Sequence, residues 1–323
     1  MHSLVRPFLF ALSPMFLLFA GLLSTPHCAS ASQVQESVAT APSLDNLKSR
    51  AEDGDAKAQF SLAVHYLRSN PAAPDYGSAI KWLRASASQG NTQAQFFLGY
   101  LYQAGEGIDR DFAKAAENYQ AAAEHGYAPA ANNLAYLYDR GQGVPKNLRK
   151  AVELYLVAAQ TGNYVAQFNL GTMYYRGDGV PRDYSLAAKW FRAAAEEGDA
   201  YAQHNLGFLY FKGLGVPCDY KESARWERLA AEQGELHAQT DLGYLYESGR
   251  GVPLDYVAAY AWYSRAIASG DNTGAERRKS LSGILTRRQL DAANALVAAG
   301  SSEMPRRHKQ PTTAALALLE ALR

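Results

Sequence analysis

Cysteine and net charge are both scarce in this sequence. Its 323 residues include two cysteines, and 32 Lys and Arg face 31 Asp and Glu. A nearly neutral chain offers no electrostatic basis for binding nucleic acid. The seven histidines follow no metal-binding spacing, and neither a G-x-S-x-G nucleophile motif nor a phosphate-binding glycine loop occurs. We therefore expect no catalytic residue, no cofactor and no metal ion.

The N-terminal residues resemble an export signal. Arg6 precedes an apolar run over 8–23, and Ala29-Ser30-Ala31 follows, so we predict a signal peptide over 1–31 that is cleaved after Ala31. A retained membrane anchor is the alternative, but a span needs about 20 apolar residues and this run is shorter and contains Pro14. Cleavage would leave Cys218 as the only cysteine, which excludes an internal disulfide and leaves an intermolecular one open. The expected location is the periplasm or the cell exterior, with no transmembrane segment in the mature chain.

A glycine recurs every 36 residues, which divides the middle of the chain into six units without insertion or deletion. Repeats of this length are typical of stacked arrays in which each unit buries its apolar face against the next. The recurring positions are Gly54, Gly90, Gly126, Gly162, Gly198, Gly234 and Gly270.

Each unit predicts two helices. In the unit that begins after Gly162, Ala166, Leu170 and Tyr174 share one face of a first helix, helix A. The run 177–181, Gly-Asp-Gly-Val-Pro, ends it, and Asp183 can cap a second helix, helix B.

Two further sets of equivalent positions in the six units predict how the helices pack. A small residue at place nine of helix A, such as Gly171, indicates the close approach of another backbone. The inward stripe of helix B is predicted to contain a bulky residue and then paired alanines; the bulky residues are Trp82, Leu154, Trp190, Trp226 and Trp262.

These motifs resemble the Sel1-like repeat family, a relative of the tetratricopeptide repeats. The matching pattern is A-x-x-x-L-G-x-x-Y-x-x-G-x-G-V-P-x-D-x-x-x-A-x-x-W, and it covers about two thirds of the chain. The resemblance implies an all-α, right-handed α-solenoid of antiparallel helix hairpins. We predict a linker over 32–42, an N-terminal capping helix over 43–54, six repeats over 55–270, capping helices over 271–299, and a basic linker with a short terminal helix over 300–323.

A second row of residues on helix A, at repeat positions that core packing does not determine, is the candidate binding surface. In related arrays helix A lines the concave side, so these residues would form a groove with an Asn ladder, an aromatic track and a basic rim suited to an extended or acidic protein segment. The alternative is that the Asn and aromatic residues only pack the repeats together and the basic residues are a solvated edge. The candidates are Asn133, Asn169, Asn205, Tyr100, Tyr136, Phe208, Tyr244, Arg140, Arg176 and Lys212.

One short motif suggests an enzyme instead. Ser78-Ala79-Ile80-Lys81 matches the S-x-x-K of serine β-lactamases, but the S-D-N and K-T-G partners are absent. The paired cysteines of the penicillin-binding members of the resembled family are absent too. The favoured hypothesis is an exported adaptor for protein–protein interaction, and a penicillin-recognising envelope enzyme or a peptidoglycan or glycan binder is the alternative.

Overall fold

The computed structural model describes residues 43–303, and this part contains fifteen helices and no strand. The predicted signal peptide, the predicted linker over 32–42 and residues 304–323 lie outside the described residues. No described helix is both long and apolar enough to cross a membrane. The helices are α1 (Leu44–Glu52), α2 (Ala56–Arg68), α3 (Tyr76–Ser88), α4 (Thr92–Ala104), α5 (Phe112–Glu124), α6 (Ala128–Arg140), α7 (Leu148–Gln160), α8 (Tyr164–Arg176), α9 (Tyr184–Glu196), α10 (Ala200–Lys212), α11 (Tyr220–Glu232), α12 (Leu236–Ser248), α13 (Tyr256–Ala268), α14 (Ala275–Ile284) and α15 (Arg287–Glu303).

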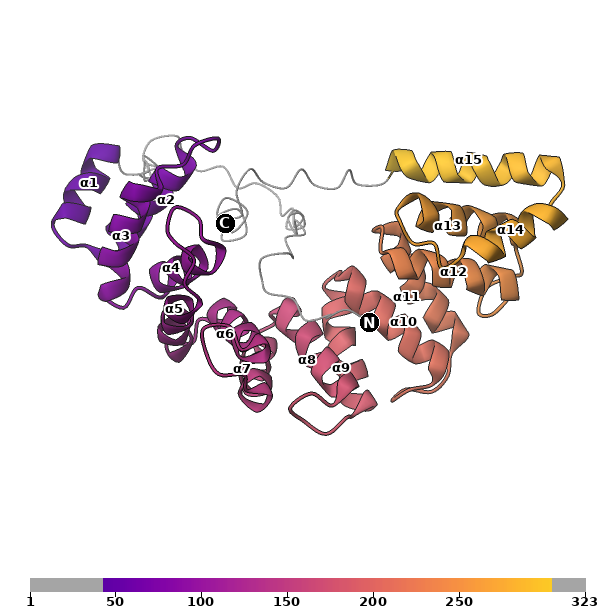
Figure 1. The fold of residues 1–323 in the computed structure, drawn as a ribbon, viewed down its shortest axis with the longest axis horizontal. Helices are drawn as coiled ribbons and strands as arrows, with labels where there is room; N and C mark the ends of the chain where they lie inside the picture. The colour runs from indigo at the N-terminus through magenta and orange to yellow at the C-terminus, as the bar shows by residue number, and fades with distance from the viewer. Residues whose placement is uncertain (1–42, 304–323) are drawn as a thin grey trace, which may run out of the picture.

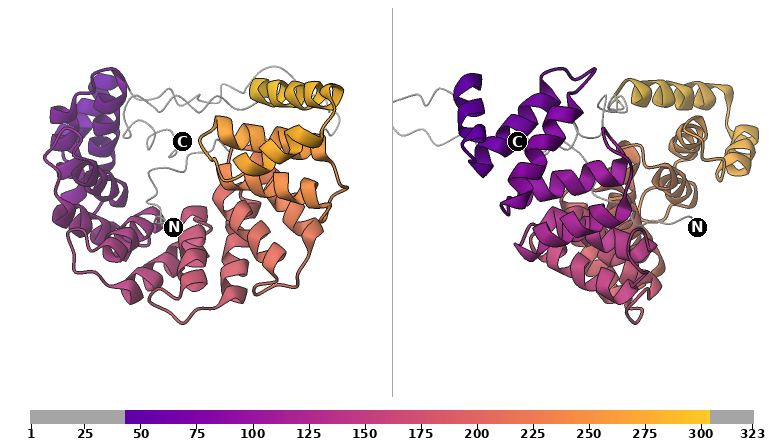
Figure 2. Two further views of the ribbon diagram at one scale, coloured as in Figure 1. Left: turned by 45° about the vertical axis from the view of Figure 1, so that its right-hand side comes forward. Right: turned by 60° about the vertical axis from the view of Figure 1, so that its left-hand side comes forward.

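The helices form the predicted α-solenoid. Even-numbered helices α2 to α12 are the A helices, and odd-numbered helices α3 to α13 are the B helices, each packed on its neighbours in chain order. The array curves into an arc with α1 at one end and α15 at the other (Figures 1 and 2). In Figure 1, α4 and α6 lie on the inner side of the arc, and α5 and α7 lie outside them.

Helix boundaries follow the local chemistry of the repeat. In α9, the Asp183 side chain accepts hydrogen bonds from the N–H groups of Ser185 and Leu186, 2.9 and 3.0 Å away, which satisfies donors that the first helical turn leaves free. The preceding A helix ends at Gly177, which has a φ of 81°. Only glycine takes this left-handed conformation without strain. Both predictions, the acidic cap and the glycine stop, are confirmed.

A buried glutamine joins each hairpin to the one before it in five of the six repeats. In α8, the Gln167 side-chain amide donates to the carbonyl of Ala159 near the end of α7, at 3.2 Å. The Ala159 carbonyl also accepts from the N–H of Gly162 at 3.1 Å, so the glutamine adds a second hydrogen bond to the end of the preceding helix. The equivalent donors are Gln59, Gln95, Gln203 and Gln239.

Two packing predictions need correction. A Cβ added at Gly171 would lie 2.7 Å from the ring of Phe191, so this glycine makes room for a side chain of the same repeat and not for another backbone. The bulky residues predicted for the inward stripe of helix B are only partly buried in four units, and Trp226 alone among them is buried, at 3% exposure. Trp190 is only half-buried, whereas Phe191 is 1% exposed. The deepest position is thus one residue later, where the units place Leu83, Tyr119, Tyr155, Phe191, Glu227 and Tyr263.

The ends of the array are closed by additional helices. The Ser43 hydroxyl caps α1, which lies within the predicted N-terminal capping helix. Thr286 and Gln289 form a capping box at the start of α15, with the Thr286 N–H donating to the Gln289 side chain at 2.9 Å. Helix α15 then continues to Glu303, past the predicted start of a linker at Gly300. A single glycine costs a helix only about 1 kcal/mol, and the first proline beyond it is Pro305.

Candidate pocket between the fifth and sixth repeats

Three of the predicted groove residues are inaccessible. Asn133, Asn169 and Tyr100 are each fully buried. The Asn169 side-chain amide donates to the side-chain oxygen of Asn132 at 3.3 Å. The Asn132 amide in turn donates to the side-chain oxygen of Asn133 at 3.2 Å. This part of the Asn ladder joins adjacent A helices inside the core. The prediction that these three side chains line an open groove is therefore wrong, because they complete the packing between repeats.

Four other predicted residues remain at the surface without forming a common site. Asn205 is partly exposed, and its amide donates to the carbonyl of Tyr201 in its own helix at 2.7 Å. The Arg140 guanidinium lies over the Tyr136 ring, 5.5 Å from its centroid. Arg176 is half-buried at the end of α8. These residues could still be reached by a partner.

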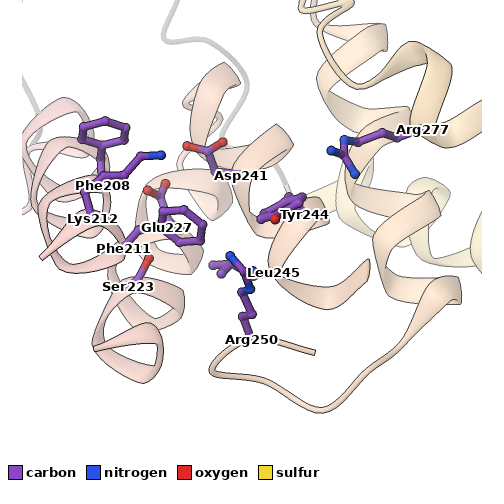
Figure 3. A pocket seen from close by; sticks show the side chains of 10 residues that line it. All are labelled: Phe208, Phe211, Lys212, Ser223, Glu227, Asp241, Tyr244, Leu245, Arg250 and Arg277. Atoms are coloured by element: carbon purple, nitrogen blue, oxygen red, sulfur yellow. The ribbon is translucent and has the colours of Figure 1, made fainter. Parts of the chain in front are cut away.

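The last three predicted residues converge on one pocket. Phe208 and Lys212 from α10 and Tyr244 from α12 line a cavity of about 370 Å³. Ser223 and Glu227 of α11 form part of the same lining (Figure 3). The rest of the lining consists of Phe211, Asp241, Leu245, Arg250 and Arg277.

Three cationic side chains surround this pocket, and each lies over an aromatic ring. Lys212 Nζ is 5.2 Å from the ring centroid of Phe211, and the Arg277 guanidinium is 4.8 Å from that of Tyr244. Arg250 lies against both of these rings. Lys212 and Arg277 approach the pocket from opposite sides (Figure 3). Such an arrangement can bind a carboxylate while covering an apolar group.

The orientation of Arg277 is fixed by a carboxylate beside the pocket. Its Nη1 lies 2.9 Å from Glu247 Oε2, and the same oxygen accepts a hydrogen bond from the Tyr263 hydroxyl at 2.7 Å. The hydrogen bond with Glu247 raises the pKa of Arg277. The guanidinium is therefore always charged and is held in place before any ligand arrives.

The pocket exists where the repeat pattern is broken. Glu227 occupies the deepest helix B position, which the other units fill with Leu, Phe or Tyr, and it is only 1% exposed. One turn earlier, Ser223 stands where the other five units have Ala, and it is also 1% exposed. Within the described part of the chain, its hydroxyl has no hydrogen-bond partner. Two buried polar groups therefore replace apolar ones on one face of α11.

A histidine and a second acid complete a cluster at the back of the pocket. His204 Nδ1 of α10 lies 2.9 Å from Glu227 Oε2 and 3.9 Å from Asp241 Oδ2 of α12. Burial raises the pKa of Glu227, against the opposing effect of His204. Burial alone would lower the pKa of His204, but the carboxylates of Glu227, Glu235 and Asp241 outweigh it and raise this pKa. The distance between Nδ1 and Oε2 is that of a hydrogen bond between the two groups.

The S-x-x-K motif, Ser78 to Lys81, has the contacts of ordinary helix surface residues. Ser78 lies in the first turn of α3, where its N–H donates to the Asp75 cap at 2.9 Å. The Lys81 ammonium lies over the Trp82 ring, 4.8 Å from its centroid. The convergent polar groups are instead at the pocket between α10, α11 and α12.

Sequence reasoning missed His204, Ser223, Glu227, Arg250 and Arg277. Comparison of the six units column by column would have found Ser223 and Glu227, since each is the polar exception in an apolar column. His204 lies in a more varied column of Phe, Asn and Thr residues. Arg250 is the variable residue of a Gly-x-Gly loop, and Arg277 lies in the C-terminal cap beyond the repeats.

The repeated hairpins and their curved stacking define an α-solenoid of the class that serves as a scaffold for protein interactions. The chain belongs to the Sel1 repeat family. Its six Sel1 repeats match over residues 56–91, 92–127, 128–163, 165–199, 200–235 and 236–271.

Two solved structures show the same solenoid. One is a protective antigen present in uropathogenic Escherichia coli strains, which displays an SLR fold; it has a TM-score of 0.73 and 33% identity, over 81% of this chain and 57% of the antigen. The other is a Sel1 repeat protein from Oxalobacter formigenes, with a TM-score of 0.62 and 31% identity, over 73% of this chain and 96% of that protein. The match therefore spans little more than half of the antigen. No curated protein matches the sequence.

Proposed function

We propose that this protein is an exported scaffold that binds an extended, acidic segment of another protein along the concave, helix A side of its array. The predicted signal peptide supports export, and membership of the Sel1 repeat family supports the role in protein interaction. The observation on which the proposal rests is the pocket, where Phe208, Lys212 and Tyr244 of the predicted groove converge.

The chemistry of the pocket favours a carboxylate attached to an apolar body. Lys212, Arg250 and Arg277 provide positive charge at the opening, and the rings of Phe211 and Tyr244 provide apolar surface. Guanidinium groups bind carboxylates through paired, charge-assisted hydrogen bonds. A cavity of about 370 Å³ admits side chains or a chain end but no folded domain. The bound group is therefore an acidic side chain or a C-terminal carboxylate of an extended segment.

A pull-down with charge-reversed variants tests this proposal. The mature chain, residues 32–323, is crosslinked in an envelope extract of its own source, in parallel with a Lys212→Glu/Arg250→Glu variant. The control is Lys81→Glu/Lys189→Glu, which reverses two exposed cations of B helices α3 and α9. We expect one protein to be enriched by the wild type and by the control but not by the pocket variant.

Peptides from the enriched protein then distinguish direct recognition from an indirect effect. Those with an acidic residue or the native C-terminus should bind the wild type at least about tenfold more tightly than the pocket variant, because each lost ion pair at a desolvated site weakens binding by more than 1.4 kcal/mol. Equal enrichment by all three chains, each confirmed as folded by circular dichroism, would refute the pocket as the binding site.

A further inference from the structure

The back of the pocket brings together three side chains from three different helices. One donor atom each from His204 of α10, Glu227 of α11 and Asp241 of α12 lies within 4.8 Å of the other two. Two of them, Glu227 and Asp241, also line the pocket. We propose that these three residues bind a divalent transition-metal ion, with Zn²⁺ as its representative, at the interface of the fifth and sixth repeats.

The distances suit such an ion. Zinc binds imidazole nitrogen and carboxylate oxygen at about 2.0–2.2 Å, so neighbouring ligand atoms of a tetrahedral site are about 3.4 Å apart. In the structure His204 Nδ1 is 2.9 Å from Glu227 Oε2 and 3.9 Å from Asp241 Oδ2. All three ligand atoms lie within 4.8 Å of one another, so side-chain shifts of about an ångström would bring them to the spacing of a tetrahedral site. Three protein ligands would leave one position open toward the cavity.

Carboxylates next to the three ligands favour a cation at this place, against the opposing charge of Lys212, Arg250 and Arg277 in the same pocket. Glu235 acts electrostatically on His204, and Asp271 acts on Asp241, so two further carboxylates lie near the three ligands. Glu235 is fixed there because its side chain caps α12 through the N–H of Ala238. A divalent ion would offset the cost of keeping Glu227 and Asp241 close together in a partly desolvated site.

Ser223 has no evident structural role at this interface. The serine hydroxyl of Ser223, one turn before Glu227 on the same helix face, is buried and lacks a partner in the described structure. A water on the open position of the ion is the kind of partner that it could bind. In the preceding repeat the equivalent residues are Ala187 and Phe191, which pack without any polar group.

The choice of ion follows from the ligands. One imidazole and two carboxylates suit Zn²⁺, Mn²⁺ or Ni²⁺, whereas Mg²⁺ prefers oxygen ligands and retains its waters. The inference does not depend on the proposed protein partner, because the ion needs only this chain. No local metal-binding spacing occurs in the sequence, because the three ligands are separated by 23 and 14 residues.

Zinc binding to the purified full chain tests the site. Calorimetric titration of the metal-free protein with Zn²⁺ should show one ion per chain, and Zn²⁺ but not Mg²⁺ should raise the melting temperature. Glu227→Gln removes one ligand charge without changing shape. His204→Phe installs the residue that Phe60, Phe96 and Phe168 provide at this place in other repeats, so the array should still fold.

Each of these variants should bind Zn²⁺ at least about tenfold more weakly. The matched control is His237→Gln, which removes an exposed imidazole that stacks on His204 at 5.8 Å and should leave the affinity within about twofold. Absence of Zn²⁺ binding by the wild type would overturn the proposal. Unchanged binding by both folded ligand variants would overturn it too, as would loss with His237→Gln alone.

Discussion

The two glycines of each Gly-x-Gly loop have different structural roles, and a pair of alanine substitutions can separate them. Gly141 and Gly143 of the loop after α6 have similar φ values of 66° and 69°. A Cβ on Gly141 would lie 3.1 Å from Lys146 Cβ of its own loop. A Cβ on Gly143 would overlap the backbone of Phe112 and Ala113, at the start of the preceding repeat's B helix.

The expected losses follow from these contacts. Alanine in the left-handed conformation costs about 1–2 kcal/mol at either position. At Gly143 the overlap with backbone atoms adds about 1–3 kcal/mol, since the loop must move away from the start of α5 to relieve it. Gly141→Ala should therefore lower the free energy of unfolding by about 1–2 kcal/mol, and Gly143→Ala should lower it by about 2–5 kcal/mol.

Urea unfolding followed by far-ultraviolet circular dichroism measures both losses. Amide hydrogen exchange provides a second readout, because only Gly143→Ala should reduce protection at the interface of the second and third repeats, in α5 and α6. If the two variants lose the same stability to within about 0.5 kcal/mol, the second glycine is not required for contact between repeats, and the reasoning fails.

Three further predictions concern caps, acidity and the pocket. Asp183→Ala should lower the free energy of unfolding by about 1 kcal/mol in urea, whereas Asp183→Asn, which still caps, should lower it by less than half of that. The backbone N–H of Lys114 donates to Asp111 and lowers the pKa of this carboxyl below 3.8. The stability that this hydrogen bond adds is therefore present above the pKa of the unfolded state. It is lost as the pH falls through the lower pKa of the folded state. Asp111→Asn should accordingly make the fall in melting temperature below about pH 4 less steep; an unchanged slope would contradict this. His204→Phe/Glu227→Phe should raise the unfolding free energy of metal-free protein by about 1–4 kcal/mol, because apolar groups replace a buried ion pair; a less stable variant in urea would contradict it.

The fold was largely predictable because the repeat depends on local rules. An acid that precedes a helix, such as Asp183, and a glycine that follows one, such as Gly177, act within four or five residues of chain. Recurrence of these signals at a constant spacing removes the ambiguity that a single occurrence would have. The rotation of helix B was less certain, since Trp190 and Phe191 are both large and apolar, and only the packed structure shows that Phe191 faces the core.

The candidate site was only partly predictable. Lys212, Phe208 and Tyr244 lie on one face of the A helices, which helical periodicity indicates correctly. The same periodicity cannot show how closely two A helices approach, and this distance decides whether Asn169 lines a groove or is buried between repeats, as it is. Arg277 reaches the pocket from the cap beyond the sixth repeat, so its place depends on tertiary structure alone.

The location of the polar cluster is consistent with the energetics of a repeat array. Stability in such an array is approximately a sum of repeat and nearest-neighbour terms, so one weak interface is tolerated when its neighbours are strong. The same holds for a weak repeat among well-packed ones, and the fourth repeat is well packed, with the rings of Phe168 and Phe191 5.8 Å apart. At the same two positions of the fifth repeat, His204 and Glu227 form a buried polar pair, which contributes less than well-packed apolar groups of similar volume. Chance substitution of one member would leave an uncompensated buried charge that costs about 3–5 kcal/mol. The presence of both members, beside a cavity and an unpaired buried hydroxyl, is therefore better explained by a ligand that recovers this energy on binding than by packing alone.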